Sequence, residues 1–269
     1  MKKITTLLLI LLSSILFSQT VDTSYLNVVS WNIQNFGRSK SANDTVMKYL
    51  AQKLKSYDII AVQEVSTSEF GAQAVAKLDD LLDRTGSSWD YVVSNPTSGE
   101  GSERYAYLYK KSRVKLKTKP ELESTLSDKL NREPFKSIFV FRGNEYYFFN
   151  LHLVPTDKKP EIEAGYLSTL GQTYSGKRII FMGDLNLSQS SPGFDGVKKW
   201  SKPLLINKKT SLKMKDDGEG YLNQEYDNFF ITPNITVKSS DVILFFKDFT
   251  LLKQARKVSD HCPIFCQIK

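Results

Sequence analysis

Short apolar runs alternate along the chain with amphipathic helical segments, and this alternation limits the folds that are open to it. Residues 26–31 and 58–63 are apolar stretches of strand length, typical of buried strands. Residues 42–56 and 70–84 repeat apolar side chains at helical spacing, as in helices that cover a sheet. Further strands rich in Tyr, Phe and Val are expected at 89–94, 104–110, 136–142, 145–153, 178–186, 226–232 and 261–268.

Hairpins are expected beside the helix-linked strands, with Gly143 and Asn144 forming one tight turn. Helices together with hairpins favour mixed sheets covered by helices over a purely parallel, doubly wound sheet. Residues 161–174 are expected to be helical, and the polar segment 201–225 to be rich in loops. The 269 residues show no internal repeat or low-complexity linker, so a single domain is the simplest interpretation.

The N-terminal residues have the layout of a secretory signal peptide. Lys2 and Lys3 precede an apolar run at 7–17, and small polar residues follow it. The run is shorter than the ~20 residues that a spanning helix needs, which favours a cleaved leader over a membrane anchor. We therefore expect a Sec-type signal peptide at 1–18, a mature domain at 19–269, and secretion to the periplasm or the extracellular space.

The chain is basic and contains few cysteines. Its formal charge of +8 falls to +6 once Lys2 and Lys3 are removed. A basic surface suits a polyanionic partner, although it also serves solubility alone. Cys262 and Cys266 lie four residues apart in one expected strand, roughly 13 Å at the spacing of a strand. That exceeds the ~7 Å limit for a bridge, so no disulfide between them is expected.

Polar residues stand where several of the expected buried strands begin or end. They are Asn32, Glu64, His152, Asp184, Asn186, Asp227, Asp260 and His261. Ligands of layered α/β folds bind where loops converge at strand ends, although each such residue taken singly is more often a turn or capping residue. Together these residues predict metal-assisted phosphodiester hydrolysis, because they supply oxygen donors for a hard divalent cation and two histidines for general acid–base catalysis. The basic surface suits a phosphate-bearing substrate.

Several other kinds of chemistry are excluded. The sequence has no GxSxG nucleophile elbow, no GxxxxGK[ST] phosphate loop and no HExxH zinc motif. With two histidines and two cysteines it cannot form a three-histidine or a four-cysteine zinc site.

Five segments carry a resemblance to a known family: VSWNIQNFG, YDIIAVQEV, MGDLN, YDNFFI and SDHCPI. In these the chain resembles the endonuclease/exonuclease/phosphatase superfamily and, within it, the deoxyribonuclease I family. SERY, NREPF and NLHLVPTD follow in the family's order, so the likeness extends from Leu26 to Ile268. It implies a four-layer α/β/β/α sandwich of two mixed β-sheets, and divalent-cation-dependent cleavage of DNA. Mg²⁺ is the expected ion, with Mn²⁺ as the alternative and a structural Ca²⁺ left open.

The resemblance also implies roles for individual residues. Two histidine–carboxylate pairs match the catalytic positions: His152 with Glu103, and His261 with Asp227. The positions that match metal or phosphate contacts are Glu64, Asn32, Asp184, Asn186 and Asp260. Arg132 matches an arginine that contacts phosphate, and Asn186 is expected to bind the substrate as well.

Two positions depart from the family's pattern. Ser66 stands where the family has an arginine that contacts DNA, and Gly101 stands where it has a tyrosine. The family's usual disulfide cysteines are also missing. These differences leave the catalytic set complete but put the mode of DNA binding in question.

The expected mechanism has His261 as general base on water and His152 as general acid for the 3′-oxygen, leaving 5′-phosphate ends; the reverse assignment stays open. The alternative function is a sphingomyelinase-like or other phosphodiesterase or phosphatase on the same fold. For it, residues 244–246 (LFF) are the nearest candidate for membrane contact. The signal peptide argues against an abasic-site repair nuclease, and the complete site argues against a non-catalytic binding protein. We expect a DNA substrate, no stable membrane association and no protein partner.

Overall fold

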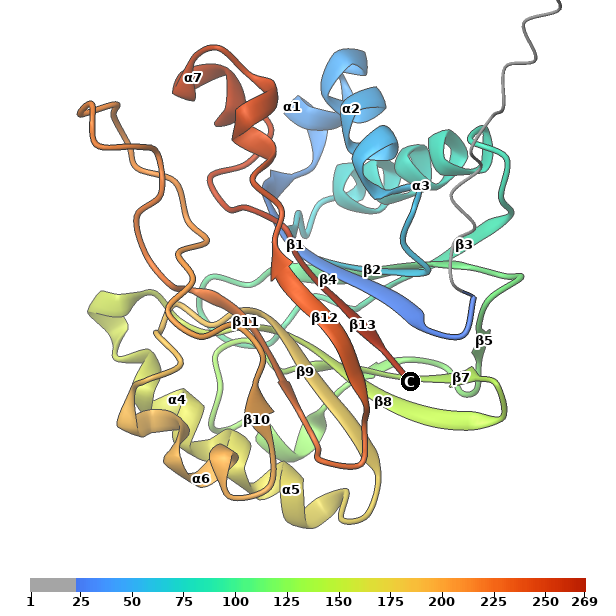
Figure 1. Ribbon diagram of the computed structural model, residues 1–269, viewed down its shortest axis with the longest axis vertical. Helices are drawn as coiled ribbons and strands as arrows, with labels where there is room; N and C mark the ends of the chain where they lie inside the picture. The colour runs from blue at the N-terminus through green and yellow to red at the C-terminus, as the bar shows by residue number, and fades with distance from the viewer. Residues whose placement is uncertain (1–22) are drawn as a thin grey trace, which may run out of the picture.

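The computed structural model describes residues 23–269, so the predicted signal peptide lies outside the described residues. Two β-sheets pack face to face, and each carries helices on its outer face (Figure 1). This is the four-layer α/β/β/α arrangement, which confirms the predicted fold class. Within the described residues, no helix has the length and apolar character needed to cross a membrane.

The first sheet has six strands in the order β12-β13-β1-β2-β4-β3. They are β1 (Leu26–Phe36), β2 (Ile59–Val65), β3 (Trp89–Val93), β4 (Arg104–Lys110), β12 (Val237–Val242) and β13 (Ile264–Ile268). β1 and β2 pair in parallel and the other neighbours pair antiparallel, as the mixed pattern of helices and hairpins predicts.

The second sheet runs in the order β10-β11-β9-β8-β7-β5, and β6 also pairs with β7. Its strands are β5 (Lys115–Leu116), β6 (Glu121–Leu122), β7 (Phe135–Phe141), β8 (Asn144–His152), β9 (Arg178–Asp184), β10 (Lys202–Pro203) and β11 (Asp227–Ile231). β8 and β9 are its parallel pair. Each sheet therefore has a parallel pair at its centre, whose carboxyl ends lie at one edge.

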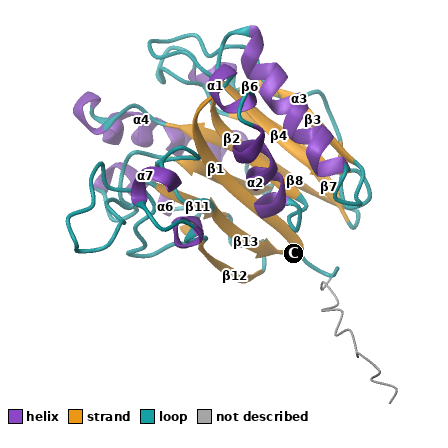
Figure 2. Cartoon of the chain, turned by 90° about the horizontal axis from the view of Figure 1, so that it is seen from above, coloured by secondary structure: helices purple, strands orange, loops and turns teal. Residues whose placement is uncertain are grey.

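The helices form two separate outer layers (Figures 1 and 2). The first sheet is covered by α1 (Arg38–Ser41), α2 (Asp44–Leu54), α3 (Glu69–Asp83) and α7 (Leu252–Ala255). The second is covered by α4 (Pro160–Tyr166), α5 (Leu170–Thr173) and α6 (Asp195–Lys198). The Asn43 side chain caps α2 by accepting a hydrogen bond from the Val46 amide at 3.2 Å, and Gly86 follows α3 with a φ of 100°.

The alternation of side chains in β1 shows how one strand serves two cores. Val28 packs into the apolar layer between the sheets, whereas Val29 and Trp31 pack against the outer helices. In the layer between the sheets, Tyr107 stacks on Phe135 with ring centroids 5.4 Å apart. Burial of each such aromatic ring contributes about 2–3 kcal/mol, so this layer supplies much of the stability.

A buried polar contact joins the two sheets next to their carboxyl-end edge. Gln63 of β2 donates from Nε2 to Asn150 Oδ1 of β8 at 2.5 Å, and both side chains are fully buried. Asn150 in turn donates to the Val62 carbonyl at 3.0 Å. Since Glu64 follows Gln63, and His152 lies two residues after Asn150, this contact fixes the two candidate site residues relative to one another.

Three local predictions differ from the structure. Phe141 pairs with Asn144, so the tight turn is formed by Arg142 and Gly143, with φ of 50° and 79°, one residue earlier than expected. Residues 161–174 form α4, a 3₁₀ turn and α5 instead of one helix. The last strand begins at Ile264 because the preceding residues form the loop that carries His261. Cys262 and Cys266 are both buried and free.

Candidate active site

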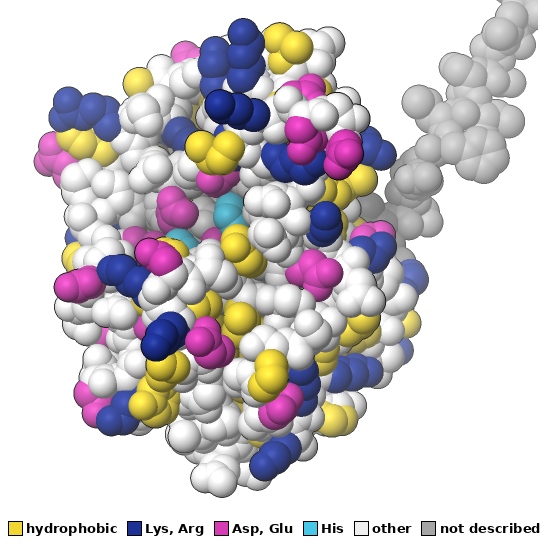
Figure 3. All heavy atoms as spheres, turned by 90° about the vertical axis from the view of Figure 1, so that its left-hand side faces the viewer, with side chains coloured by type: hydrophobic (Ala, Val, Ile, Leu, Met, Phe, Trp, Pro, Cys, Tyr) yellow, Lys and Arg dark blue, Asp and Glu magenta, His cyan; other side chains and the backbone are white. Residues whose placement is uncertain are grey.

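A cleft of about 920 Å³ opens where the carboxyl ends of the parallel strands of both sheets meet. Histidine side chains are visible in this hollow with acidic side chains beside them (Figure 3). Of the residues proposed from the sequence, seven line it: Glu64, Glu103, Arg132, His152, Asp184, Asn186 and His261. Asn32 and Asp227 are buried behind this lining, with 0% and 2% exposure.

The first histidine–carboxylate pair lies at the end of β8. His152 Nδ1 is 2.8 Å from Glu103 Oε2, and both side chains are buried. A carboxylate can only accept, so Nδ1 carries the proton and the neutral ring keeps a free lone pair on Nε2. Glu103 also accepts from Arg132 Nη1 at 3.3 Å and from the Glu64 amide at 3.1 Å. The Glu103 carboxylate therefore orients His152 while it holds the backbone of a second site residue.

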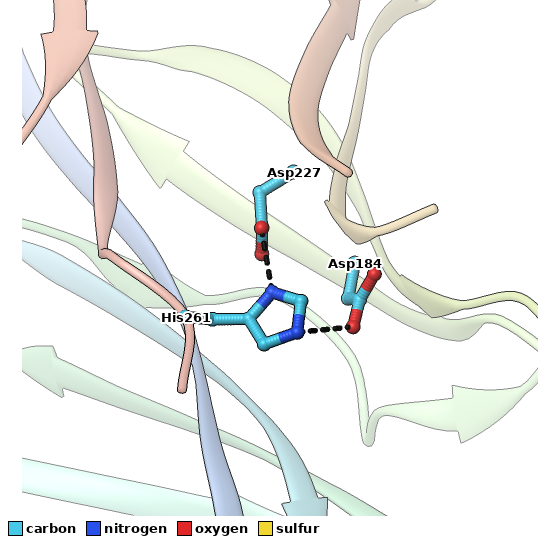
Figure 4. A group of neighbouring side chains, drawn as sticks. All are labelled: Asp184, Asp227 and His261. Carbon is cyan, nitrogen blue, oxygen red and sulfur yellow. Dashed lines mark hydrogen bonds and ion pairs between the residues drawn. The ribbon is translucent and has the colours of Figure 1, made fainter. Parts of the chain in front are cut away.

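The second pair joins the start of β11 to the loop before β13. His261 Nδ1 is 2.7 Å from Asp227 Oδ2, again with both side chains buried (Figure 4). The Asp227 amide donates to Thr210 Oγ1 at 2.9 Å, and the His261 amide donates to Ser259 Oγ at 3.0 Å. These backbone contacts fix both members of the pair, so this imidazole also presents Nε2 to the cleft.

Asp184, at the end of β9, lies between the two imidazoles. Its Oδ2 is 3.3 Å from His261 Nε2 (Figure 4) and 3.5 Å from His152 Nε2. Gly183 precedes it with a φ of 144°, and a Cβ there would lie 1.9 Å from the Leu151 carbonyl oxygen. The backbone thus needs glycine at this point to bring the Asp184 carboxylate to the place that both Nε2 atoms face.

The carboxylates change the titration of both histidines. Although burial lowers it, the charges of Glu103 and Asp184 together raise the pKa of His152. Burial acts the same way on His261, but Asp184 and Asp227 raise its pKa well above the usual range. Burial also opposes ionisation of Asp184, yet the two imidazoles and the Asn186 amide lower the pKa of its carboxyl group. The ionised carboxylate and the imidazolium forms stabilise one another in this cluster.

Glu64 and Asn32 lie beside Asp184 and supply a set of oxygen donors. Asn32 Nδ2 donates both to Glu64 Oε1 at 2.8 Å and to Asp184 Oδ2 at 3.0 Å, so one amide separates the two carboxylates. Glu64 has a φ of 58°, a left-handed conformation that is costly for a residue other than glycine. The two carboxylates fit the ligand preference of a hard divalent cation. Asn32 would join them through Oδ1, which here accepts from the Gln34 amide at 2.9 Å. Asp184, Asp227 and His261 form a second group whose ligand atoms lie within 4.8 Å of one another.

Three of the proposed residues have contacts that specify what they can do. Arg132 is buried, and it donates to Glu103 and, from Nη2, to the Leu153 carbonyl at 2.6 Å, so most of its guanidinium supports the first pair. Asn186 Nδ2 donates to the same carbonyl at 3.0 Å. Asp260 does not line the cleft; its Oδ2 accepts from Gln34 Nε2 at 2.7 Å.

Several supporting residues are not apparent from the sequence pattern. The buried Lys40 donates from Nζ to the Ile33 carbonyl at 2.9 Å and to the Val258 carbonyl at 2.5 Å, which ties the end of β1 to the His261 loop. Ser259 Oγ donates to the Asn32 carbonyl at 2.5 Å across the same junction. A lysine or serine in a polar segment is ordinarily solvated, so no signal in the sequence singles these residues out.

Two histidine–carboxylate pairs that face one acidic cleft define a class of protein: a hydrolase of the nuclease and phosphodiesterase kind. The chain belongs to the Endonuclease/Exonuclease/phosphatase family, whose model matches residues 29–261, and within that superfamily to the deoxyribonuclease I-like group. This confirms the resemblance carried by the sequence motifs.

Individual relatives are similar over much of the chain. A protein named deoxyribonuclease from Thioalkalivibrio is 28% identical over 263 residues, which is 89% of this chain and 70% of that protein. Deoxyribonuclease-1 of Homo sapiens is 32% identical over 192 residues, covering 66% of this chain and 67% of the human protein. A mannosyl-6-phosphatase from Bacteroides thetaiotaomicron matches in structure with a TM-score of 0.68 at 20% identity, covering 91% of this chain and 99% of that one. The structural match shows a shared fold.

Proposed function

We propose that the protein is a secreted, divalent-cation-dependent endodeoxyribonuclease whose mature part, residues 19–269, is a single catalytic domain. The carrying observation is that two histidine–carboxylate pairs from different parts of the chain direct their Nε2 atoms at one buried carboxylate oxygen, Asp184 Oδ2. A phosphodiester bound at that point would lie between a group that can take a proton and a group that can give one.

In the proposed reaction, His261 accepts a proton from the attacking water, and Asp227 stabilises the imidazolium that results. His152, held by Glu103, donates its Nε2 proton to the 3′-oxygen as that oxygen leaves, which produces 5′-phosphate ends. Each carboxylate fixes its imidazole with the proton on Nδ1 when the ring is neutral. The pairs differ in surroundings, because Arg132 contacts Glu103 and no described arginine or lysine pairs with Asp227.

Glu64, Asn32 and Asp184 are the residues that would hold the cation, with Asn186 and Asp260 as the remaining proposed metal or phosphate positions. Mg²⁺ is the proposed ion and Mn²⁺ the alternative; when bound, it supplies Lewis-acid neutralisation of phosphate charge and lowers the pKa of the adjacent imidazoles. Arg132 and Asn186 both line the cleft and both donate to the Leu153 carbonyl, and their remaining N–H groups are the proposed donors to a non-bridging phosphate oxygen. The Nε of Arg132 has no partner among the described residues but is buried, so the proposed phosphate contact falls to the terminal nitrogens of the guanidinium.

DNA is the substrate that the relatives and the charge favour. Curated relatives that match this chain are named deoxyribonucleases, and the chain keeps a net positive charge of +6 without Lys2 and Lys3. The alternative of a lipid phosphodiesterase is weakened. Residues 244–246 were its nearest candidate for membrane contact, and Phe245 in this segment is fully buried against the first sheet. The signal peptide predicted at residues 1–18 supports export.

Digestion of supercoiled plasmid by the secreted protein tests the proposal. Nicking is expected with Mg²⁺ or Mn²⁺ and none with excess EDTA, and the products should accept ligation without added kinase because they carry 5′-phosphates. Release of phosphocholine from sphingomyelin at a comparable rate, without plasmid nicking, would replace the proposal with the lipid alternative.

The division of roles between the histidines can be tested with a substrate whose leaving 3′-oxygen is replaced by sulfur. A thiolate leaves without protonation, so this substrate should restore activity to His152→Ala and leave His261→Ala inactive. Restoration of His261→Ala instead would reverse the assignment and keep the rest of the proposal.

A further inference from the structure

The cleft extends past the catalytic residues to an end formed by two short segments. Residues 35–39 run from the end of β1 into α1, and residues 66–70 run from the end of β2 into α3. Most residues of both segments line the cleft. The segments are packed together, because a Cβ on Gly37 would lie 2.9 Å from Ser66 Cβ, and the Ser66 amide donates to the Phe36 carbonyl at 3.0 Å. The Asn35 amide donates to Glu64 Oε2 at 2.9 Å, so this end adjoins the proposed metal site directly.

Arg38 is the cationic side chain that lines the cleft at this end; Arg104 contacts the Thr67 carbonyl but does not line the cleft. Its side chain is exposed, and its guanidinium carbon lies 3.7 Å from the centre of the Phe70 ring. Stacking at this distance fixes the plane of the guanidinium and leaves its N–H groups free at the edge. Among the described residues no carboxylate forms an ion pair with Arg38, whereas Arg132 and both histidines in the cleft are paired with carboxylates.

The other residues that line the cleft at this end offer hydroxyl groups and no acid, since Glu69 is exposed but does not line the cleft. Ser66 and Ser68 hydrogen-bond to one another through their hydroxyls at 2.9 Å, and both line the cleft with Thr67. The acidic lining residues, Glu64, Glu103 and Asp184, all belong to the catalytic end. A polynucleotide strand can place its scissile phosphate at the two histidines and extend toward residues 35–39 and 66–70. There its backbone would meet a cation and hydroxyl groups.

We propose that Arg38, held in place by Phe70, forms a subsite for a non-scissile phosphate of the polynucleotide that is being cut. The subsite rests on the proposed nuclease function and adds a substrate preference to it. A guanidinium fork matches two phosphate oxygens, and a flanking phosphate is present only in a substrate with more than one phosphodiester. Arg38 therefore selects for polynucleotides over single diesters.

The test compares Arg38→Gln with a matched control, Arg142→Gln. Arg142 is also an exposed arginine beside a phenylalanine ring, 6.0 Å from Phe141, but it lies on the β7–β8 turn and does not line the cleft. The kcat/KM is measured in Mg²⁺ for plasmid DNA and for bis(4-nitrophenyl) phosphate, with salt varied over about 50 to 200 mM.

The Arg38→Gln change is expected to lower the ratio of the two kcat/KM values about tenfold, the loss typical of one charge-assisted phosphate contact. The dependence of log(kcat/KM) on log[salt] for DNA should become shallower by about one unit. Arg38→Lys should keep the salt dependence of the parent but show a lower ratio of kcat/KM for DNA to kcat/KM for the single diester. Phe70→Leu should lower this ratio by a smaller factor than Arg38→Gln does. The subsite proposal would be overturned if Arg38→Gln and Arg142→Gln showed the same kcat/KM ratio and the same salt dependence. If the parent protein itself fails to cut DNA, the nuclease proposal fails instead.

Discussion

Replacing Asp227 by asparagine should separate catalysis from folding. Asp227 Oδ2 lies 2.7 Å from His261 Nδ1, and the Asp227 amide donates to Thr210 Oγ1 at 2.9 Å. An asparagine that presents its NH₂ group to Nδ1 makes that nitrogen the acceptor. The proton of the neutral imidazole moves to Nε2, the atom that faces the cleft, so His261 can no longer take a proton from water.

The expected loss follows from that change of tautomer. Mis-orientation of this kind in a histidine–carboxylate pair costs about 10³–10⁴-fold in kcat, which is about 4–5.5 kcal/mol of transition-state free energy. The free energy of unfolding should change by only about 1 kcal/mol. Asparagine has nearly the same shape, and the change removes a buried charge next to Asp184, which offsets the lost charge-assisted hydrogen bond.

The assay is the kcat for plasmid nicking in saturating DNA and Mg²⁺, with urea unfolding measured on the same preparations. Asp128→Asn is the matched control, because Asp128 is exposed and pairs only with its neighbour Lys129 among the described ion pairs. A kcat for Asp227→Asn within about threefold of the parent would refute an orienting role for this carboxylate. A fall in kcat accompanied by an equally large loss of folding stability would attribute the effect to structure.

Three further predictions concern residues around the site. Burial lowers the pKa of Lys40 to about 8, against the opposing charges of Asp260 and Glu64. Above pH 8 the unfolded chain therefore binds more protons than the folded protein, and the unfolding free energy of the parent should rise by about 2 kcal/mol between pH 8 and 10, relative to that of Lys40→Met. Urea titrations measure both proteins. A difference between them that does not change with pH would contradict the buried charge. Gly183→Ala should lower the unfolding free energy by at least about 2 kcal/mol, because its Cβ meets the Leu151 carbonyl; a thermal melt unchanged from the parent would show that the strand adapts. Burial raises the pKa of both Cys262 and Cys266, so Ellman's reagent should label neither thiol in the native protein and both in urea; labelling of the native protein would show that the strand opens.

The layered fold follows from features that are visible in the sequence. Each long apolar run needs burial on both faces, and the helical segments have one apolar stripe each, so sheets covered by helices are the simplest arrangement that buries all of them. The local errors have local causes. The β7–β8 turn shifted by one residue because Arg142 takes a left-handed conformation that sequence statistics assign to glycine or asparagine.

The candidate site was predictable as a set of residues but not as a geometry. The histidines and their carboxylates stand at strand ends in the sequence, whereas the place of Asp184 between both Nε2 atoms depends on how the two sheets pack. Supporting contacts such as those of Lys40 and Thr210 join segments far apart in the chain, and no local pattern encodes them. The same is true of Arg38, whose importance appears only when Phe70 is seen beneath it.

The central claim is that His152 and His261 act together on one phosphodiester in this cleft. The most direct test is the rate of plasmid nicking in Mg²⁺ by His152→Ala, by His261→Ala and by the double variant, each shown by circular dichroism to be folded. The account predicts that each single variant loses about 10²–10⁴-fold in kcat and that the double variant cleaves no faster than the slower single variant. A double variant that nicks plasmid at the parent's rate would contradict it.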